Sequence, residues 1–194
     1  QVHRMKGESA DLGQAAREYE RTIRLLTNCP APAIPALDLV LLGLGEDGHT
    51  ASLFPGTAAL SEQNQLVTVG QSPKGIAGRI TLSLGVINRA TVVLFLVTGA
   101  GKAQTVRAVL QPHTQAEHAL PAAQVKPEGG RLVWLLDNAA ATRAGDRHER
   151  LRRIRRRIQF HLDGVVSIAL RLQAHAVGGR HHFEVQSFRL QDVG

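Results

Sequence analysis

Only one of the 194 residues is a cysteine, Cys29. A single thiol cannot form an internal disulfide, which excludes a disulfide-stapled secreted scaffold and is typical of a reducing compartment such as the cytoplasm. Long apolar runs are missing too, because none reaches the roughly 18 residues of a membrane-spanning helix. Residues 1–13 lack the apolar core of a signal peptide. We therefore expect a cytoplasmic protein without a membrane anchor.

Recognisable metal-binding patterns are also missing. His181 and His182 are adjacent, and His113 and His118 are five positions apart, but neither pair comes with cysteines or clustered carboxylates. We expect no metal site and no cofactor.

Positive charge is concentrated in the last quarter of the chain. Residues 1–142 carry 12 Lys/Arg and 11 Asp/Glu, a net charge of +1, whereas residues 143–194 carry 11 Arg and 5 Asp/Glu, a net charge of +6. We predict an α/β domain over 1–142 and an Arg-rich extension over 143–194. The extension has the spacing of a basic amphipathic helix over 147–175, followed by a strand or hairpin. Aromatic residues for base stacking are not interleaved there, so we favour a solvated appendage over nucleic-acid binding.

The apolar pattern of the first domain alternates between strand-like and helix-like segments. Strands are predicted at short apolar runs, over residues 37–43, 79–84, 91–99 and 129–138. Helices are predicted over 9–28, where Ser9 can serve as the N-cap, and over 101–111. This alternation predicts right-handed βαβ units, and therefore an α/β fold with a mostly parallel sheet flanked by helices in three layers.

The loop GLGEDG (43–48) directly follows the first predicted strand. Its glycine spacing resembles a dinucleotide-binding loop, but Glu46 and Asp47 would repel a pyrophosphate, and no suitable acid follows for the ribose. The loop also places Asp47 and His49 on either side of a glycine that permits a tight turn. A carboxylate can fix the tautomer of a nearby imidazole and raise its basicity, so His49 could activate water. A helix starting near residues 50–52 could hold an anion. The alternative is that Asp47 only caps a helix and His49 is solvated.

Several long segments together resemble the 6-phosphogluconolactonase family. They are VHRMKGESADLGQAAREYE (2–20), LDLVLLGLGEDGHTASLFPG (37–56), RITLSLGVINRA (79–90), VLFLVTGAGKA (93–103) and LPAAQVKPEGGRLVWLLDNAAA (120–141). The resemblance covers about residues 2–141, in order and with sensible spacing. It implies the Rossmann-like fold of the sugar-phosphate isomerases and lactonases. The family's N-terminal part has no counterpart in residues 1–36, so the resemblance implies an N-terminally incomplete domain.

The resemblance also implies a reaction, the hydrolysis of 6-phospho-D-glucono-1,5-lactone to 6-phosphogluconate in the oxidative pentose phosphate pathway. His49 is then the general base and Asp47 the residue that orients it. Gly45 and Gly48 of the same loop are predicted to line the substrate site.

Two cations are predicted to bind the phosphate of this substrate. Lys102 follows a strand and exposed glycines at a helix start, where backbone N–H groups favour an anion. The motif is not a P-loop, because Ala103 stands where Ser or Thr would hold magnesium. Arg79 is assigned to the same role by the resemblance. The alternative for each is a surface cation.

Two other functions remain open at this stage. Glucosamine-6-phosphate deaminases share the fold and a G-x-D-G-H loop, but the resemblance gives them a glutamate where this chain has Phe54, which cannot carry a proton. The other possibility is an inactive remnant whose basic tail binds polyanions. The oligomeric state cannot be predicted from the sequence.

Overall fold

The computed structural model describes residues 2–144, 172–177 and 180–185. The contacts divide the chain into two units, residues 1–151 and 152–194. In the second unit β6 (Leu172–Val177) pairs antiparallel with β7 (Arg180–Val185). The predicted hairpin is therefore confirmed there, whereas residues 172–175 are strand and not the end of a helix. The rest of the predicted basic helix lies outside the described residues, and the domain boundary after residue 142 stays a prediction.

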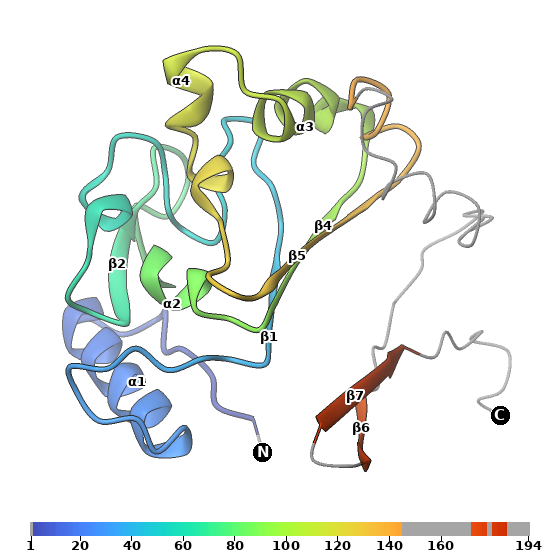
Figure 1. Ribbon diagram of the computed structural model, residues 1–194. Helices are drawn as coiled ribbons and strands as arrows, with labels where there is room; N and C mark the ends of the chain where they lie inside the picture. Colours follow the sequence, from blue (N-terminus) through green and yellow to red (C-terminus); the bar gives the residue numbers. More distant parts are fainter. Residues whose placement is uncertain (1, 145–171, 178–179, 186–194) are drawn as a thin grey trace, which may run out of the picture. The chain divides into compact units, whose positions relative to one another are not determined.

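A parallel sheet forms the centre of the first unit (Figure 1). It contains β1 (Leu39–Leu42), β4 (Val92–Val97) and β5 (Arg131–Leu136), in the order β1-β4-β5, and both pairings are parallel. The three strands coincide with three of the predicted apolar runs. The α/β prediction is confirmed, and the parallel strands place their carboxyl ends, and the loops that follow them, at one edge of the sheet.

The predicted strand over 79–84 forms, but it does not join the parallel sheet. It is β3 (Gly78–Leu82), and it pairs antiparallel with β2 (Val67–Gln71) in a separate hairpin. Only six residues, 72–77, connect the two strands. A connection that short turns the chain straight back, whereas a parallel partner needs a crossover of a dozen residues or more.

Helices cover one face of the sheet and the hairpin. The helix α1 (Leu12–Leu26) packs on β2 and β3, and α2 (Leu84–Asn88) and α3 (Ala103–Leu110) pack on the parallel sheet. Asp11 caps α1 by accepting a hydrogen bond from Gln14 N at 2.8 Å. The predicted cap was wrong, because Ser9 donates its hydroxyl to the carbonyl of Asp11 instead. Short helical turns complete the unit: η1 (Ala58–Ser61), η2 (Ala100–Lys102), α4 (Gln115–His118) and η3 (Pro121–Gln124).

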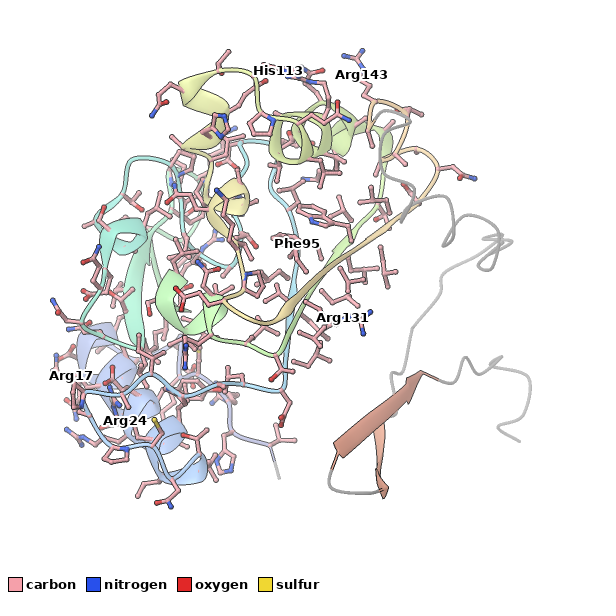
Figure 2. All side chains as sticks on the ribbon, viewed as in Figure 1. Arg17, Arg24, Phe95, His113, Arg131 and Arg143 are labelled. Carbon is pink, nitrogen blue, oxygen red and sulfur yellow. The ribbon has the colours of Figure 1, made fainter. Side chains whose placement is uncertain are left out.

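The core lies between these helices and the parallel sheet. Phe95, labelled in Figure 2, is fully buried. Its ring stacks on that of Trp134, with ring centroids 4.0 Å apart and an interplanar angle of 3°. Trp134 is 7% exposed and belongs to this core. On the opposite face of the sheet Leu41 is 54% exposed and Leu96 is 47% exposed. Within residues 2–144, helices therefore cover one face of the sheet. No helix of the described residues is long and apolar enough to span a membrane.

Candidate active site

The loop after β1 is closed by its own hydrogen bonds. Gly45 N donates to the carbonyl of His49 at 2.8 Å, and Gly48 N donates to the carbonyl of Gly45 at 3.1 Å. The buried Thr50 donates its hydroxyl to the carbonyl of Gly43 at 2.9 Å. These bonds join both ends of the loop, so the side chains between them are held at the carboxyl edge of the sheet.

His49 and Asp47 form the pair that the sequence predicts. The distance from His49 Nδ1 to Asp47 Oδ1 is 2.5 Å, and His49 N donates to the same oxygen at 3.2 Å. A carboxylate at Nδ1 favours the tautomer with the proton on Nδ1, which leaves Nε2 able to accept a proton. Burial raises the pKa of the Asp47 carboxyl, but hydrogen bonds from the His49 side chain and backbone outweigh this and lower it below its ordinary value of 3.8. Asp47 is therefore ionised at neutral pH.

Two glycines make this geometry possible. A Cβ on Gly45 would lie 2.0 Å from His49 Nδ1 and 2.5 Å from Asp47 Oδ1, so a side chain there would displace the pair. Gly48 has a φ of +82°, and a Cβ on it would approach Leu120 Cδ2 to 2.8 Å. These contacts show that both glycines shape the loop that carries His49, and their predicted place in the lining of the substrate site stays a prediction.

The predicted helix start at residues 50–52 was wrong. Thr50 and Leu53 form an isolated antiparallel bridge around a tight turn, in which Ala51 has a φ of +50°. Ser52 N donates to the hydroxyl of Thr81 on β3 at 3.1 Å, so this N–H is already satisfied by the protein. The turn joins the loop to the β2–β3 hairpin and offers no helix N-terminus to an anion.

Phe54 connects the imidazole to Arg79. Its buried ring lies 4.4 Å from the His49 ring between centroids, and Arg79 Cζ lies 5.8 Å from the Phe54 centroid. Arg79 is oriented by two carbonyl oxygens, since Nε donates to Ile76 O at 3.2 Å and one terminal nitrogen donates to Lys74 O at 3.3 Å. The arrangement links Arg79 to the imidazole of His49 through the Phe54 ring.

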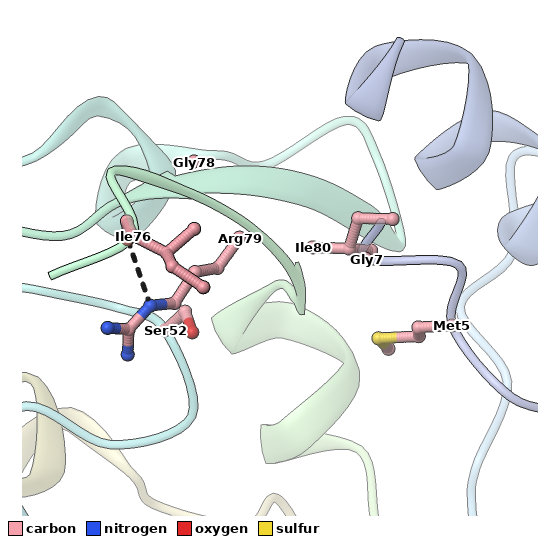
Figure 3. A pocket seen from close by; sticks show the side chains of 7 residues that line it. All are labelled: Met5, Gly7, Ser52, Ile76, Gly78, Arg79 and Ile80. Atoms are coloured by element: carbon pink, nitrogen blue, oxygen red, sulfur yellow. Dashed lines mark hydrogen bonds between the residues drawn. The ribbon is translucent and has the colours of Figure 1, made fainter. Parts of the chain in front are cut away.

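Arg79 also lines an open pocket of about 430 Å³ (Figure 3). Its guanidinium points past Ser52, and the dashed line in Figure 3 marks its bond to the carbonyl of Ile76. The other lining residues are Met5, Gly7, Ser52, Ile76, Gly78 and Ile80. His49 does not line this pocket, whereas Arg79 both lines it and lies over the Phe54 ring.

Lys102 lies in η2, on the loop after β4, and Glu46 brings that loop against the loop after β1. Thr105 of α3 donates its hydroxyl to the carbonyl of Glu46 at 2.7 Å, and a Cβ on Gly101 would lie 3.0 Å from Glu46 Oε1. Among the described residues the ammonium group of Lys102 has no hydrogen bond or ion pair. The structure therefore brings the loop that carries Lys102 against the loop that carries His49. It also places the Glu46 carboxylate beside the loop that carries Lys102.

Sequence reasoning missed the connecting roles of Phe54, Glu46 and Thr105. Phe54 was considered only as the absence of an acid, and Glu46 only as an obstacle to a pyrophosphate. No local signal was available for Thr105, because the carbonyl of Glu46 that it bonds is 59 positions away in the sequence. The Phe54 contacts depend on long-range packing that local patterns do not encode.

An imidazole oriented by a carboxylate, at the carboxyl edge of a parallel sheet, is typical of an α/β enzyme that moves a proton to or from water or substrate. The chain belongs to the family of glucosamine-6-phosphate isomerases and 6-phosphogluconolactonases, whose sequence profile matches residues 1–134. The resemblance of the motifs to this family is thereby confirmed over most of the described domain.

Characterised relatives agree with this assignment. The chain is 45% identical over 128 residues to 6-phosphogluconolactonase of Rattus norvegicus, covering 66% of this chain and 48% of the relative. It is 42% identical over 139 residues to that of Synechocystis sp., covering 72% and 56%. The structure matches 6-phosphogluconolactonase from Trypanosoma brucei with a TM-score of 0.62 and 32% identity, covering 74% of this chain and 58% of that one. The chain thus spans about half the length of the curated relatives that it matches.

Proposed function

We propose that this chain hydrolyses 6-phospho-D-glucono-1,5-lactone to 6-phosphogluconate, as a cytoplasmic step of the oxidative pentose phosphate pathway. The observation that carries the proposal is the contact between Asp47 and the Nδ1 atom of His49, which leaves Nε2 free to act on a substrate. The names of the relatives support the choice of a lactone, because the rat and Synechocystis proteins are both 6-phosphogluconolactonases.

His49 acts first as a general base. Nε2 takes a proton from a water molecule while the water oxygen bonds to the lactone carbonyl carbon, giving a tetrahedral intermediate with a negatively charged oxygen. The imidazole becomes a cation in this step. The ionised Asp47 carboxylate stabilises that cation through the Nδ1–H hydrogen bond.

The same histidine then acts as a general acid. The intermediate collapses, the bond between the carbonyl carbon and the ring oxygen breaks, and the proton on Nε2 passes to the departing ring oxygen. The products are an open-chain carboxylic acid and a hydroxyl group, and His49 returns to its neutral form. These proton transfers and bond changes require no metal or cofactor, since the lactone carbonyl is itself electrophilic.

Arg79 and Lys102 bind the phosphate of the substrate in this proposal. They come from different elements, the β2–β3 hairpin and the loop after β4. Each loop contacts the loop that carries His49, through Phe54 on one side and Glu46 on the other. Phe54 also argues against deaminase chemistry, because a phenyl ring has no proton to transfer.

The test is lactone decay in the presence of the purified 194-residue chain, measured above the spontaneous rate. We expect acceleration by the wild-type chain and a loss of about 10²- to 10⁴-fold in kcat for His49→Ala, the usual contribution of a general base. His113→Ala is the control, because His113 is an exposed histidine outside this loop.

Two results would contradict the proposal. One is the absence of any acceleration by a wild-type sample whose circular dichroism and cooperative unfolding show that it is folded. The other is a His49→Ala variant that keeps the wild-type rate.

A further inference from the structure

The loop between β2 and β3, residues 72–77, is closed by hydrogen bonds of Ser72. Ser72 N donates to the carbonyl of Ala77 at 2.7 Å. The Ser72 hydroxyl donates to the carbonyl of Lys74 at 2.7 Å, and Lys74 N donates back to the same hydroxyl at 3.4 Å. Gly75 has a φ of +71°, which lets the chain turn tightly at that point. The hydroxyl of Ser72 therefore fixes the direction of the Lys74 carbonyl.

The carbonyl of Lys74 also accepts a hydrogen bond from Arg79. The Nη2 atom of Arg79 donates to it at 3.3 Å, while Nε donates to the carbonyl of Ile76 at 3.2 Å. A carbonyl oxygen has two lone pairs, so that of Lys74 can accept from Ser72 and Arg79 at the same time. The loop thus holds the guanidinium with two neutral oxygens, and one of these oxygens is itself held by Ser72.

The positive charge of Arg79 is not neutralised within residues 2–144. No carboxylate of the described residues forms an ion pair with it, whereas Arg24 and Arg107 are each paired with a glutamate. The Nη1 atom of Arg79 makes no hydrogen bond in the same part of the chain. Arg79 is therefore fixed in place by neutral groups, and it keeps both its charge and part of its planar fork of N–H groups for an anion.

We propose that Ser72 is a positioning residue, which holds the Lys74 carbonyl so that Arg79 presents its unoccupied N–H groups to the phosphate of the substrate. This role rests on the proposed function, in which Arg79 binds that phosphate. Ser72 is not among the residues that line the pocket, so it acts through Arg79 and does not contact the substrate itself.

The physical basis of this role is preorganisation. A flexible arginine loses side-chain freedom when it binds an anion, and hydrogen bonds made beforehand reduce that loss. Without the Ser72 hydroxyl, the Lys74 carbonyl can turn, and the guanidinium loses one of its two fixed partners. The anion then binds more weakly. The pair of His49 and Asp47 is unaffected, because no hydrogen bond of the described residues joins it to the 72–77 loop.

The test is binding of 6-phosphogluconate to the purified 194-residue chain, measured by isothermal titration calorimetry, together with the steady-state kinetics of lactone hydrolysis. We expect Ser72→Ala to weaken binding about three- to fivefold and to raise KM by a similar factor, with kcat changed less than about twofold. Ser72→Thr keeps a hydroxyl group at this position and is expected to bind nearly as well as wild type.

Two further variants separate positioning from a general effect on the fold. Ser9→Ala is the matched control, because Ser9 also donates its hydroxyl to a carbonyl two positions further on, that of Asp11. We expect it to leave the affinity unchanged. In the double variant Ser72→Ala/Arg79→Ala, loss of the hydroxyl is expected to change the affinity of Arg79→Ala by less than about 1.5-fold, because the two residues act as one unit.

Ser72 has no positioning role if Ser72→Ala binds 6-phosphogluconate as tightly as wild type, or if Ser72→Thr is as impaired as Ser72→Ala. The same conclusion follows if Ser72→Ala weakens binding equally with and without Arg79, or if the folded wild-type chain binds no 6-phosphogluconate. A chain that shows the expected coupling in binding but does not accelerate lactone decay would contradict the proposed hydrolysis and would support the role of Ser72.

Discussion

The ring of Phe54 packs against the imidazole of His49, and the guanidinium of Arg79 lies over the same ring. Its centroid is 4.4 Å from the centroid of the imidazole and 5.8 Å from Cζ of the guanidinium. One buried ring therefore contacts both groups. Arg79 also lines the open pocket. One apolar side chain therefore contacts both the imidazole proposed as the general base and the guanidinium proposed to bind the phosphate.

Arg79 lines a pocket that His49 does not line, which predicts that Arg79 affects binding more than chemistry. We expect Arg79→Ala to raise KM for the lactone about tenfold and to change kcat by less than about threefold, because the lost cation contacts the phosphate and not the carbonyl. Steady-state kinetics with Arg17→Ala as the control would measure this, since Arg17 is an exposed arginine on α1. A large loss of kcat with unchanged KM would assign Arg79 to the reacting atoms instead.

Alanine substitutions at Gly45 and Gly43 of the loop are predicted to have different effects on kcat. We expect Gly45→Ala to lower kcat at least about tenfold, because its Cβ would lie 2.0 Å from His49 Nδ1 and would displace the imidazole from Asp47. Gly43→Ala is the matched control, since a Cβ there meets no atom within 4 Å and its φ is not positive. Equal activities of the two variants would show that the position of the His49 ring is unimportant.

Much of the parallel sheet could be predicted from the sequence because its strands are continuous apolar runs. The runs that contain Val40, Phe95 and Trp134 are short and bounded by glycine or polar residues, and this identifies buried strands without knowledge of their partners. The His49–Asp47 pair could be predicted too, since the two residues are separated by only one glycine and the contact is local.

Pairings and contacts between distant residues could not be predicted in the same way. The apolar pattern of Ile80 and Leu82 indicates a strand but contains no information on its partner, and β3 pairs with β2 instead of the main sheet. Gly70 of β2 illustrates the difficulty, because its missing side chain makes room for the carbonyl of Ser52, 2.0 Å from where a Cβ would lie. Only the folded chain brings those two residues together.

The Asp47 carboxylate predicts a pH dependence of stability with a definite sign. Its folded-state pKa is below the ordinary value, so its hydrogen bonds stabilise the folded chain above the unfolded-state pKa of about 3.9. That stabilisation is lost as the pH falls through the lowered folded-state value. We expect Asp47→Asn to unfold at a lower temperature than wild type at about pH 7, with a difference that narrows towards about pH 3.

The same variant tests the orienting role in catalysis. An amide cannot stabilise the imidazole cation as a carboxylate does, so Asp47→Asn should lower kcat by about 10²-fold or more with a smaller change in KM. Asp11→Asn is the control, because Asp11 caps α1 away from the loop. A variant with wild-type kcat between about pH 5 and pH 8 would remove Asp47 from the mechanism.

Removal of the negative charge of Glu46 is predicted to strengthen substrate binding. It lies against Gly101 in the loop that presents Lys102, so it repels any phosphate bound there. We expect Glu46→Gln to lower KM for the lactone about two- to fivefold, with kcat unchanged, since a like charge at an exposed site contributes less than about 1 kcal/mol. The gain should shrink in high salt, because salt screens charges at the surface. Glu62→Gln, in a different loop, serves as the control. If Glu46→Gln instead raised KM, the phosphate would have to bind away from Lys102, and Arg79 would be left as its ligand.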